Sequence, residues 1–157
     1  MKILIKNGYI VNENKIFESD ILVNGELIEK IDKEISSTYV DKVIDCNGSL
    51  ILPGIIDDQV HFREPGYPNK ATIYSESRAA VAGGITSYFE MPNTNPSTTT
   101  IEGLNHKFKI ASTSSLANYS FMFGGTNQNI SEVKKLPKHE VPGIKLFLGS
   151  STGNMLV

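Results

Sequence analysis

Hydrophobic residues in the first third of the chain occur in short runs separated by polar residues and glycines, a spacing typical of β-strands. Strands are predicted at residues 3–5, 9–11, 21–23, 27–28 and 43–45. Asn24-Gly25 separates two of these runs, and this dipeptide favours a tight hairpin turn in which both turn positions have positive φ. Residues 1–50 are therefore expected to form a small all-β domain.

After residue 50 the pattern alternates between apolar strand-like runs and amphipathic helices. Strands are predicted at residues 51–57, 85–91, 119–123 and 143–148, with helices between them at 72–82, 100–111 and 129–136. Thr99 and Glu102 have the spacing of a capping box for the second helix, and Gly83-Gly84 follow the first helix, where glycine is favoured. The alternation predicts an α/β fold with a parallel sheet and helices outside it.

The length of this second region limits how much of an α/β barrel it can form. A barrel of eight βα units takes about 250 residues, whereas residues 51–157 supply about four units. We therefore expect the chain to be a fragment that carries the first half of a barrel; the alternative is a complete four-stranded α/β domain. The isolated piece is expected to be inactive and poorly stable, because half a barrel leaves an open strand edge and uncovered apolar faces.

Composition narrows the class of protein. The chain is 39% hydrophobic and 20% charged, which is typical of folded globular proteins and not of disordered or fibrous ones. Its net charge is −2 and no basic cluster occurs, so neither nucleic acid nor a membrane surface is expected as a partner. The N-terminus lacks the apolar core of a secretory signal, so a cytoplasmic location is expected. The single cysteine, Cys46, excludes a disulfide framework.

Polar residues cluster where the first of the parallel strands is predicted to end, and in parallel α/β folds the chemistry lies at that end. His61 follows this strand, close to Asp57 and Asp58. Imidazole and carboxylate groups are the usual ligands of catalytic zinc. Because residues two apart in an extended segment point the same way, Asp57, Gln59 and His61 are expected to share one side. Taken alone, the segment favours a solvated loop over a metal site.

Two further residues are suited to binding a carboxylate. Arg63 follows His61 by two positions, and its guanidinium can form two parallel hydrogen bonds to a carboxylate; the alternative is a surface ion pair with Glu64. Asn93 follows the next predicted strand, and its amide can donate to a carboxylate or accept from a ring N–H; the alternative is a simple turn.

Lys145 lies within the predicted apolar strand at residues 143–148. A buried, unpaired ammonium is costly, so this lysine is expected to pair, lose its charge or be carboxylated to a carbamate that can bridge two metals. Alternatively, it faces the helix layer or solvent. The following segment, residues 149–153, lacks the spacing of a P-loop and is expected to be a strand-end turn. His106 and His139 are expected to be exposed and without a role.

Taken together, these motifs resemble the dihydroorotases of the amidohydrolase superfamily. The resemblance is carried by Pro53-Gly54-Ile55-Ile56-Asp57, Val60-His61-Phe62-Arg63-Glu64-Pro65-Gly66, residues 79–86, Met91-Pro92-Asn93-Thr94 and residues 145–153. It spans the whole chain, since the β-rich start is also typical of these enzymes. The presence of both Arg63 and Asn93 favours a dihydroorotase over the related hydantoinases and allantoinases.

The resemblance implies a β-sandwich, begun by residues 1–50, beside a (β/α)8 TIM barrel begun by residues 51–157. It implies reversible, zinc-dependent hydrolysis of the cyclic amide of dihydroorotate to N-carbamoyl-aspartate in pyrimidine biosynthesis, by a protein that is a homo-oligomer. Zinc, as one or two ions, would polarise the ring carbonyl and activate a water molecule. The general-base aspartate and two more histidine ligands are expected from later strands, so no catalytic residue is assigned within these 157 residues.

The same resemblance assigns roles to individual side chains. His61 and a carboxylated Lys145 would be metal ligands, and Arg63 with Asn93 would hold the substrate carboxylate. The family pattern is Asp-x-His-x-His, and here Gln59 replaces the first histidine. An amide oxygen is a weaker zinc ligand than imidazole, so Gln59 and Asp57 are the weaker candidate ligands. Two alternatives follow: a non-catalytic dihydroorotase-like partner of another pyrimidine enzyme, or another cyclic amidase such as an allantoinase.

Overall fold

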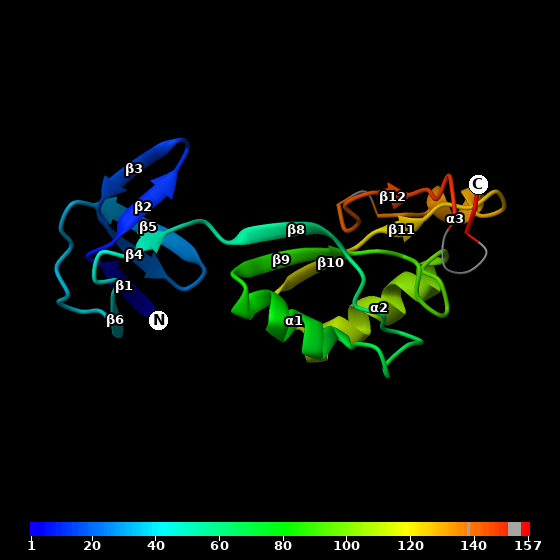
Figure 1. Ribbon diagram of the computed structural model, residues 1–157, viewed down its shortest axis with the longest axis horizontal. Helices are drawn as coiled ribbons and strands as arrows, with labels where there is room; N and C mark the ends of the chain where they lie inside the picture. The colour runs from blue at the N-terminus through cyan, green and yellow to red at the C-terminus, as the bar shows by residue number, and fades with distance from the viewer. Residues whose placement is uncertain (138, 151–154) are drawn as a thin grey trace. The chain divides into compact units, whose positions relative to one another are not determined.

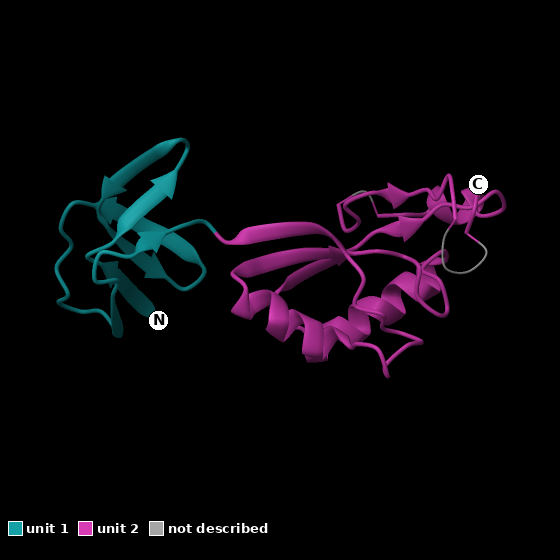
Figure 2. Ribbon diagram, in the orientation of Figure 1, with its two compact units in different colours: residues 1–53 teal, residues 54–157 magenta. Residues whose placement is uncertain are grey.

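The computed structural model of this chain describes residues 1–137, 139–150 and 155–157. Ser151, Thr152 and Gly153 of the predicted strand-end turn lie outside these residues. The chain divides into two compact units, Met1–Pro53 and Gly54–Val157 (Figure 2).

The first unit consists of two sheets. One has the strand order β5 (Leu27–Asp32), β4 (Asp20–Asn24), β1 (Lys2–Lys6) and β6 (Lys42–Asp45), and the other has the order β3 (Lys15–Glu18), β2 (Tyr9–Asn12) and β7 (Leu50–Ile51). Leu4, Ile10 and Ile21, one from each of three strands, are buried. The alternation of apolar and polar residues in β1, β2 and β4 thus supplies the apolar interior of this unit.

The turns of this unit differ from the sequence prediction. Asn24 pairs with Leu27 across the β4–β5 hairpin, so the turn residues are Gly25 and Glu26, and the predicted Asn24-Gly25 turn is wrong by one position. Only Gly25 has positive φ (61°), at the first turn position, where a type II′ turn requires glycine.

A second hairpin, between β2 and β3, was not predicted. Its turn residues, Glu13 and Asn14, both have positive φ (48° and 59°). Hydropathy does not reveal it, because every side chain of β3 is exposed.

The second unit alternates strands and helices. Its elements are β8 (Ile55–Val60), α1 (Ile73–Ala82), β9 (Ile85–Glu90), α2 (Ile101–Ser114), β10 (Asn118–Phe121), β11 (Phe123–Gly124), α3 (Ile130–Val133) and β12 (Ile144–Lys145). Strands β8, β9 and β10 form a parallel sheet in chain order, and β11 and β12 form a second parallel pair (Figure 1). The predicted α/β class with parallel strands is confirmed. Within the described residues these strands do not close a barrel.

The first predicted strand of this unit, residues 51–57, begins too early. Leu50 and Ile51 pair with β2 in the first unit, and the chain becomes extended again only at Ile55. Pro53-Gly54 separates the two strands, since proline lacks the N–H that a strand ladder uses and glycine weakens strands. Strand β8 also ends later than predicted, at Val60. Asp57 therefore lies within the strand rather than at its end.

Helices α1 and α2 cover one face of the β8–β10 sheet (Figure 1). Helix α1 starts after Thr72, whose side chain accepts a hydrogen bond from Ser75 N. Helix α2 starts after Thr100, which accepts from Gly103 N, so the predicted Thr99–Glu102 capping box is wrong by one position. No helix in the described part of the chain is both long and apolar enough to cross a membrane.

The core of this unit lies between the helices and the sheet. It contains Phe62, Ile73, Ala80, Tyr88, Leu104, Ala111, Ala117, Phe121 and Phe123. Phe62 and Tyr88, from neighbouring strands, stack with ring centroids 4.5 Å apart. The core therefore begins directly beneath the segment that carries His61.

The last predicted strand is much shorter than expected. Only Ile144 and Lys145 form β12, which pairs with β11 alone among the described strands. Leu146 and Leu148 are 52% and 81% exposed, so the prediction of a buried strand over residues 143–148 is wrong. Helix α3 is likewise shorter than the predicted 129–136.

Candidate active site

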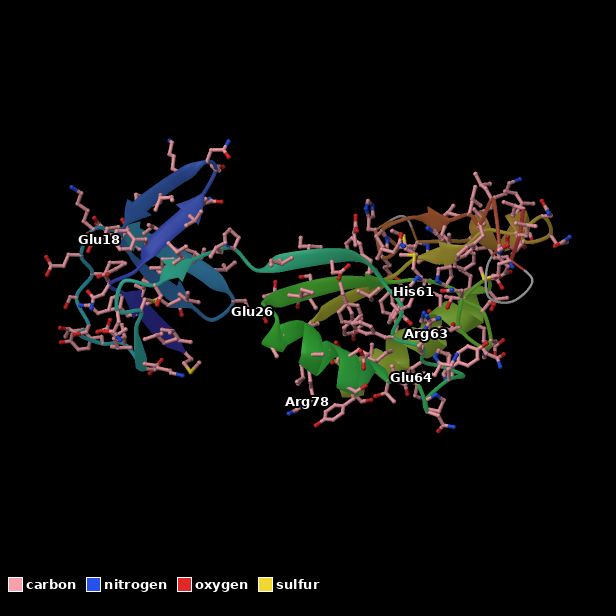
Figure 3. The ribbon with its side chains drawn as sticks, in the orientation of Figure 1. Glu18, Glu26, His61, Arg63, Glu64 and Arg78 are labelled. Carbon is pink, nitrogen blue, oxygen red and sulfur yellow. The ribbon has the colours of Figure 1, made fainter. Side chains whose placement is uncertain are left out.

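The segment that ends β8 carries the first candidate residues. Val60 packs against the core and Phe62 is part of it, so the intervening alternation puts Gln59 and His61 on the face away from the helices. Figure 3 shows His61, Arg63 and Glu64 in succession where the chain leaves the strand. Gln59 and His61 can therefore act on the same side of the sheet.

Asp57 does not follow this alternation. It pairs with Tyr88, whereas Val60 pairs with Glu90, and the register between β8 and β9 shifts between these two pairs. One extra residue in β8 accounts for the shift, as in a β-bulge. Because a bulge interrupts the strict alternation, the shared side expected for Asp57, Gln59 and His61 does not follow from their two-residue spacing. Asp57 Oδ1 instead accepts a local hydrogen bond from Gln59 N at 3.1 Å.

His61 meets Asn93, the candidate residue that follows β9. The distance between His61 Nδ1 and Asn93 Oδ1 is 2.8 Å, a hydrogen bond in which the imidazole donates to the amide oxygen. With its proton on Nδ1, the ring keeps a free lone pair on Nε2. The amide nitrogen of Asn93 donates to no residue in the described ranges and stays available to a ligand.

Backbone hydrogen bonds hold Asn93 in place. Met91 N donates to Val60 O at 2.9 Å, and Thr94 N and Thr98 N both donate to Pro92 O at 2.9 Å. Asn93 itself is only 8% exposed. The turn interpretation of Met91-Pro92-Asn93-Thr94 is thus correct for the backbone, while the side chain is directed at His61.

The pKa of His61 is lowered from its ordinary value, chiefly by partial burial of the ring. The hydrogen bond with Asn93 opposes this shift, and the positive charges of Arg63, Lys145 and Lys107 reinforce it. A lowered pKa keeps the imidazole neutral at neutral pH, the form that binds a metal.

The backbone at Arg63 has a left-handed conformation, which is unusual for a residue other than glycine. Its φ is +65°, so the chain leaves the extended conformation there and the two-residue spacing from His61 does not by itself fix the direction of the side chain. Arg63 forms no ion pair with any residue that the structure describes. Glu64, its proposed alternative partner, instead accepts a hydrogen bond at Oε2 from Ile73 N, 2.7 Å away, at the start of α1.

A backbone hydrogen bond joins the loop that carries Arg63 to the loop that carries Asn93. Asn95 N donates to Pro65 O at 3.1 Å. Gly66 has a φ of +104°, and a Cβ there would collide with the backbone oxygen and Cβ of Asn95. This close approach requires glycine, and it fixes the distance between the two candidate carboxylate-binding residues.

Lys145 is partly buried at the end of β12. Its Nζ lies 3.5 Å from Gln59 Oε1 and 5.5 Å from the centroid of the Phe147 ring. The structure thus brings Lys145 to the same side of the sheet as Gln59, 86 residues earlier in the chain.

Within the described residues, no three His, Cys, Asp or Glu side chains converge. Of the candidate donors, the amide of Gln59 and the amine of Lys145 approach each other at 3.5 Å, and the imidazole of His61 contacts Asn93. His106 and His139 are exposed, as predicted.

Sequence reasoning missed two groups near this site. Lys107 of α2 and Glu90 of β9 form a buried ion pair, with Nζ 2.5 Å from Oε2 and both side chains 1% exposed. Burial raises the pKa of Glu90 and lowers the pKa of Lys107. The spacing contained a signal, because Lys107 lies three residues after Leu104 and four before Ala111 on the buried stripe of α2.

The second missed residue is Asn129. Its Nδ2 donates to Thr99 O at 2.9 Å and to Gly124 O at 2.8 Å, and its Oδ1 accepts from Thr126 N at 2.8 Å. The loops after β9 and β11 are therefore joined by one amide group. No local sequence pattern predicts such a contact, because the three partners are backbone atoms.

Comparison with known proteins supplies relatives for this arrangement. The dihydroorotase of Methanosarcina acetivorans is 38% identical over 152 residues, covering 96% of this chain and 32% of that protein. The allantoinase of Desulfitobacterium hafniense is 36% identical over 146 residues, covering 92% and 32%. The solved structure of L-hydantoinase (dihydropyrimidinase) from Arthrobacter aurescens superimposes with a TM-score of 0.92 at 29% identity, covering 99% of this chain and 35% of that one.

The chain spans about a third of the length of these relatives. A family model described as "Dihydro-orotase-like" matches residues 48–133, more than half of the 157 residues. This match includes β8, His61, Arg63 and Asn93. The chain therefore belongs to the dihydro-orotase-like family.

Proposed function

We propose that the protein containing this chain is a dihydroorotase that reversibly hydrolyses the cyclic amide of dihydroorotate to N-carbamoyl-aspartate in pyrimidine biosynthesis. In this reaction water adds to the ring carbonyl carbon, and the ring nitrogen leaves with a proton to become the carbamoyl amide. The substrate also carries a carboxylate away from the bond that breaks. A site for it needs both a place for the reacting amide and a separate carboxylate-binding group.

The observation that carries the proposal is the contact between Asn93 and His61, next to the Arg63 loop. Asn93 Oδ1 takes the imidazole proton at 2.8 Å, and its Nδ2 remains free to donate to an anion. Arg63, held through the Pro65–Asn95 contact, has no protein carboxylate as a partner in the described ranges. In the proposed enzyme, this guanidinium and this amide bind the substrate carboxylate.

The donors of this chain fit part of a zinc site. His61 would bind through Nε2, the nitrogen that Asn93 leaves free, which matches the usual arrangement of a metal-bound histidine with an outer hydrogen-bond partner. Lys145, as a carbamate, and Gln59 would bind from the adjoining strand ends. Asp57 is the weaker candidate because of the shifted register. When bound, zinc would polarise the carbonyl of the ring amide.

The complete site requires donors beyond these. A catalytic zinc site usually has three protein ligands, and the described residues supply His61 as the only imidazole among the candidates. In the proposed enzyme the remaining histidine ligands and the general base come from later strands of a TIM barrel, whose first strands are β8 to β12. The proposed enzyme is a cytoplasmic homo-oligomer.

The test is substrate turnover by the complete protein that contains this sequence. We expect hydrolysis of dihydroorotate and condensation of N-carbamoyl-aspartate, with Arg63→Ala losing both. The matched control is Arg78→Ala, since Arg78 lies on α1 and its side chain donates to Tyr74 (Figure 3). Absence of dihydroorotate turnover in a zinc-loaded, folded protein would overturn the proposal.

An allantoinase is the second candidate, favoured by the allantoinase of D. hafniense, which is 36% identical over 92% of the chain. Allantoin carries no carboxylate for Arg63 to bind. Turnover of allantoin but not dihydroorotate, insensitive to Arg63→Ala, would establish this alternative. A folded full-length protein without zinc would favour the third interpretation, a non-catalytic partner, which the replacement of histidine by Gln59 motivates.

A further inference from the structure

A charged pair lies buried between the sheet and the helices of the second unit. Lys107, on α2, and Glu90, at the end of β9, are each 1% exposed at the side chain, and Nζ lies 2.5 Å from Oε2. Burial raises the pKa of Glu90 most, although the backbone N–H of Phe62 also faces this carboxylate and lowers that pKa. Such a pair is weak evidence for stability, because burying both charges costs about as much as their attraction returns.

The remaining contacts of Lys107 lead toward the site. Its Nζ donates to Met91 O at 3.2 Å, and it lies 4.8 Å from the centroid of the Phe121 ring. On the other side, Met91 N donates to Val60 O at 2.9 Å. The peptide groups on both sides of Met91 are therefore fixed, one by β8 and one by the ammonium of Lys107.

Asn93 follows Met91 by two residues, with Pro92 between them. Proline fixes its own φ, so the direction of the chain at Met91 largely sets where Asn93 begins. Asn93 Oδ1 then lies 2.8 Å from His61 Nδ1. One short, stiff connection thus links the buried ammonium to the hydrogen bond that orients the imidazole.

We propose that Lys107 is a positioning residue, which holds the Met91 carbonyl and thereby keeps Asn93 against His61, with Glu90 retaining the ammonium in the interior. The inference rests on the proposed function, since it assigns Lys107 to the same site. Lys107 touches neither substrate nor metal in this role. The effect of its hydrogen bond to Met91 O on the site passes through Asn93.

A double-mutant cycle in the complete protein separates this role from a contribution to stability alone. Lys107→Met should lower kcat/KM by about 10- to 100-fold, the usual effect of losing an outer-sphere partner of a metal site. In an Asn93→Ala background the same substitution should have a much smaller effect, because the residue through which the Met91 hydrogen bond acts is gone. Lys109→Met, an exposed lysine of the same helix, is the matched control and should leave kcat/KM unchanged.

A second variant keeps the test valid when Lys107→Met folds poorly. Glu90→Gln combined with Lys107→Met removes both buried charges, so folding should recover while kcat/KM stays low, because Met91 O still lacks its donor. A double variant that melts like the unsubstituted protein and has full kcat/KM would overturn the proposal. So would equal losses from Lys107→Met with and without Asn93.

One readout does not depend on the reaction. Nitrogen-15 spectra of the histidine rings in the full-length protein report whether the His61 proton is held on Nδ1, and Lys107→Met should disturb that signature whereas Lys109→Met should not. If the unsubstituted protein fails to turn over dihydroorotate, the proposed function fails and this measurement still decides the role of Lys107. An unchanged His61 signature in Lys107→Met would refute the inference.

Discussion

Asn93 Oδ1 lies 2.8 Å from His61 Nδ1, although the two residues are 32 positions apart and belong to different strand ends. The amide oxygen has no proton to give, so the imidazole is the donor and its Nε2 is the nitrogen left for a metal. In the proposed enzyme, Asn93 would therefore orient the metal-binding histidine and, through its free Nδ2, donate to the substrate.

Replacing Asn93 by leucine should weaken zinc binding, because the ring loses the acceptor that fixes its proton on Nδ1. We expect the zinc affinity to fall about 10- to 100-fold, measured by competition with a chelator. Asn93→Asp, which keeps an acceptor oxygen, should lose much less. Equal zinc affinity in the leucine variant would show that the contact has no part in metal binding.

The metal-free protein should lose stability as the pH falls through about 6.5, the ordinary pKa of His61, whose pKa in the folded protein is lower. In this range the unfolded chain takes up a proton that the folded protein does not, so acidification favours unfolding, and the loss levels off below the folded-state pKa. Urea midpoints between pH 8 and 5.5, with chelator present, should show this dependence.

The dependence should weaken in His61→Gln and persist in His106→Gln, since His106 is an exposed histidine on α2. The same slope in the unsubstituted protein and in His61→Gln would assign the pH dependence to other groups.

Gln59→His should raise zinc affinity, because imidazole is a stronger zinc ligand than an amide oxygen. Gln59 lies on the same face as His61 and within 3.5 Å of Lys145 Nζ, so a histidine there can join the same donors. Chelator competition gives the affinity. Asp58→His, a neighbouring exposed position, is the control; an equal gain from both variants would mean that the face of β8 is irrelevant.

Gly66→Ala should separate the two loops that carry Arg63 and Asn93. Gly66 and Gly84 both have positive φ (104° and 89°), but only at Gly66 would a Cβ collide with a neighbour, Asn95. Gly66→Ala and the control Gly84→Ala each carry a backbone cost of about 1–3 kcal/mol. At Gly66 the collision with Asn95 adds about 1–3 kcal/mol. Denaturant unfolding should show the difference, and only Gly66→Ala should raise KM for dihydroorotate. Equal destabilisation would contradict the close-approach argument.

The parallel α/β arrangement of the second unit could be predicted because its strands and helices differ in hydrophobic period, and that difference is local. The ends of the strands could not be predicted in the same way. Leu50 and Ile51 belong to the first unit, since their hydrogen-bond partners are in β2, and hydropathy contains no information on partners. The same holds for β12, whose apolar residues form only a two-residue strand.

At the site, sequence predicted which residues gather at one edge but not how they touch. The direction of Asp57 depends on a register shift against β9, which arises only when the strands pair. The burial of Lys107 was not predicted, because a charged residue on an amphipathic helix is normally assigned to the solvent-exposed face. The sequence shows that Lys107 has the spacing of the buried residues Leu104 and Ala111. Its burial is explained only by the ion pair with Glu90, which the structure reveals.

The single amide of Asn129 reaches the loops after both β9 and β11. A loop transferred to this position from a relative with another substrate would not place its backbone carbonyl where the Asn129 amide can donate to it. New specificity in this scaffold should therefore come from paired exchanges of neighbouring loops rather than from one loop at a time. Laboratory libraries that vary the two loops together should yield more folded variants than libraries that vary either one alone.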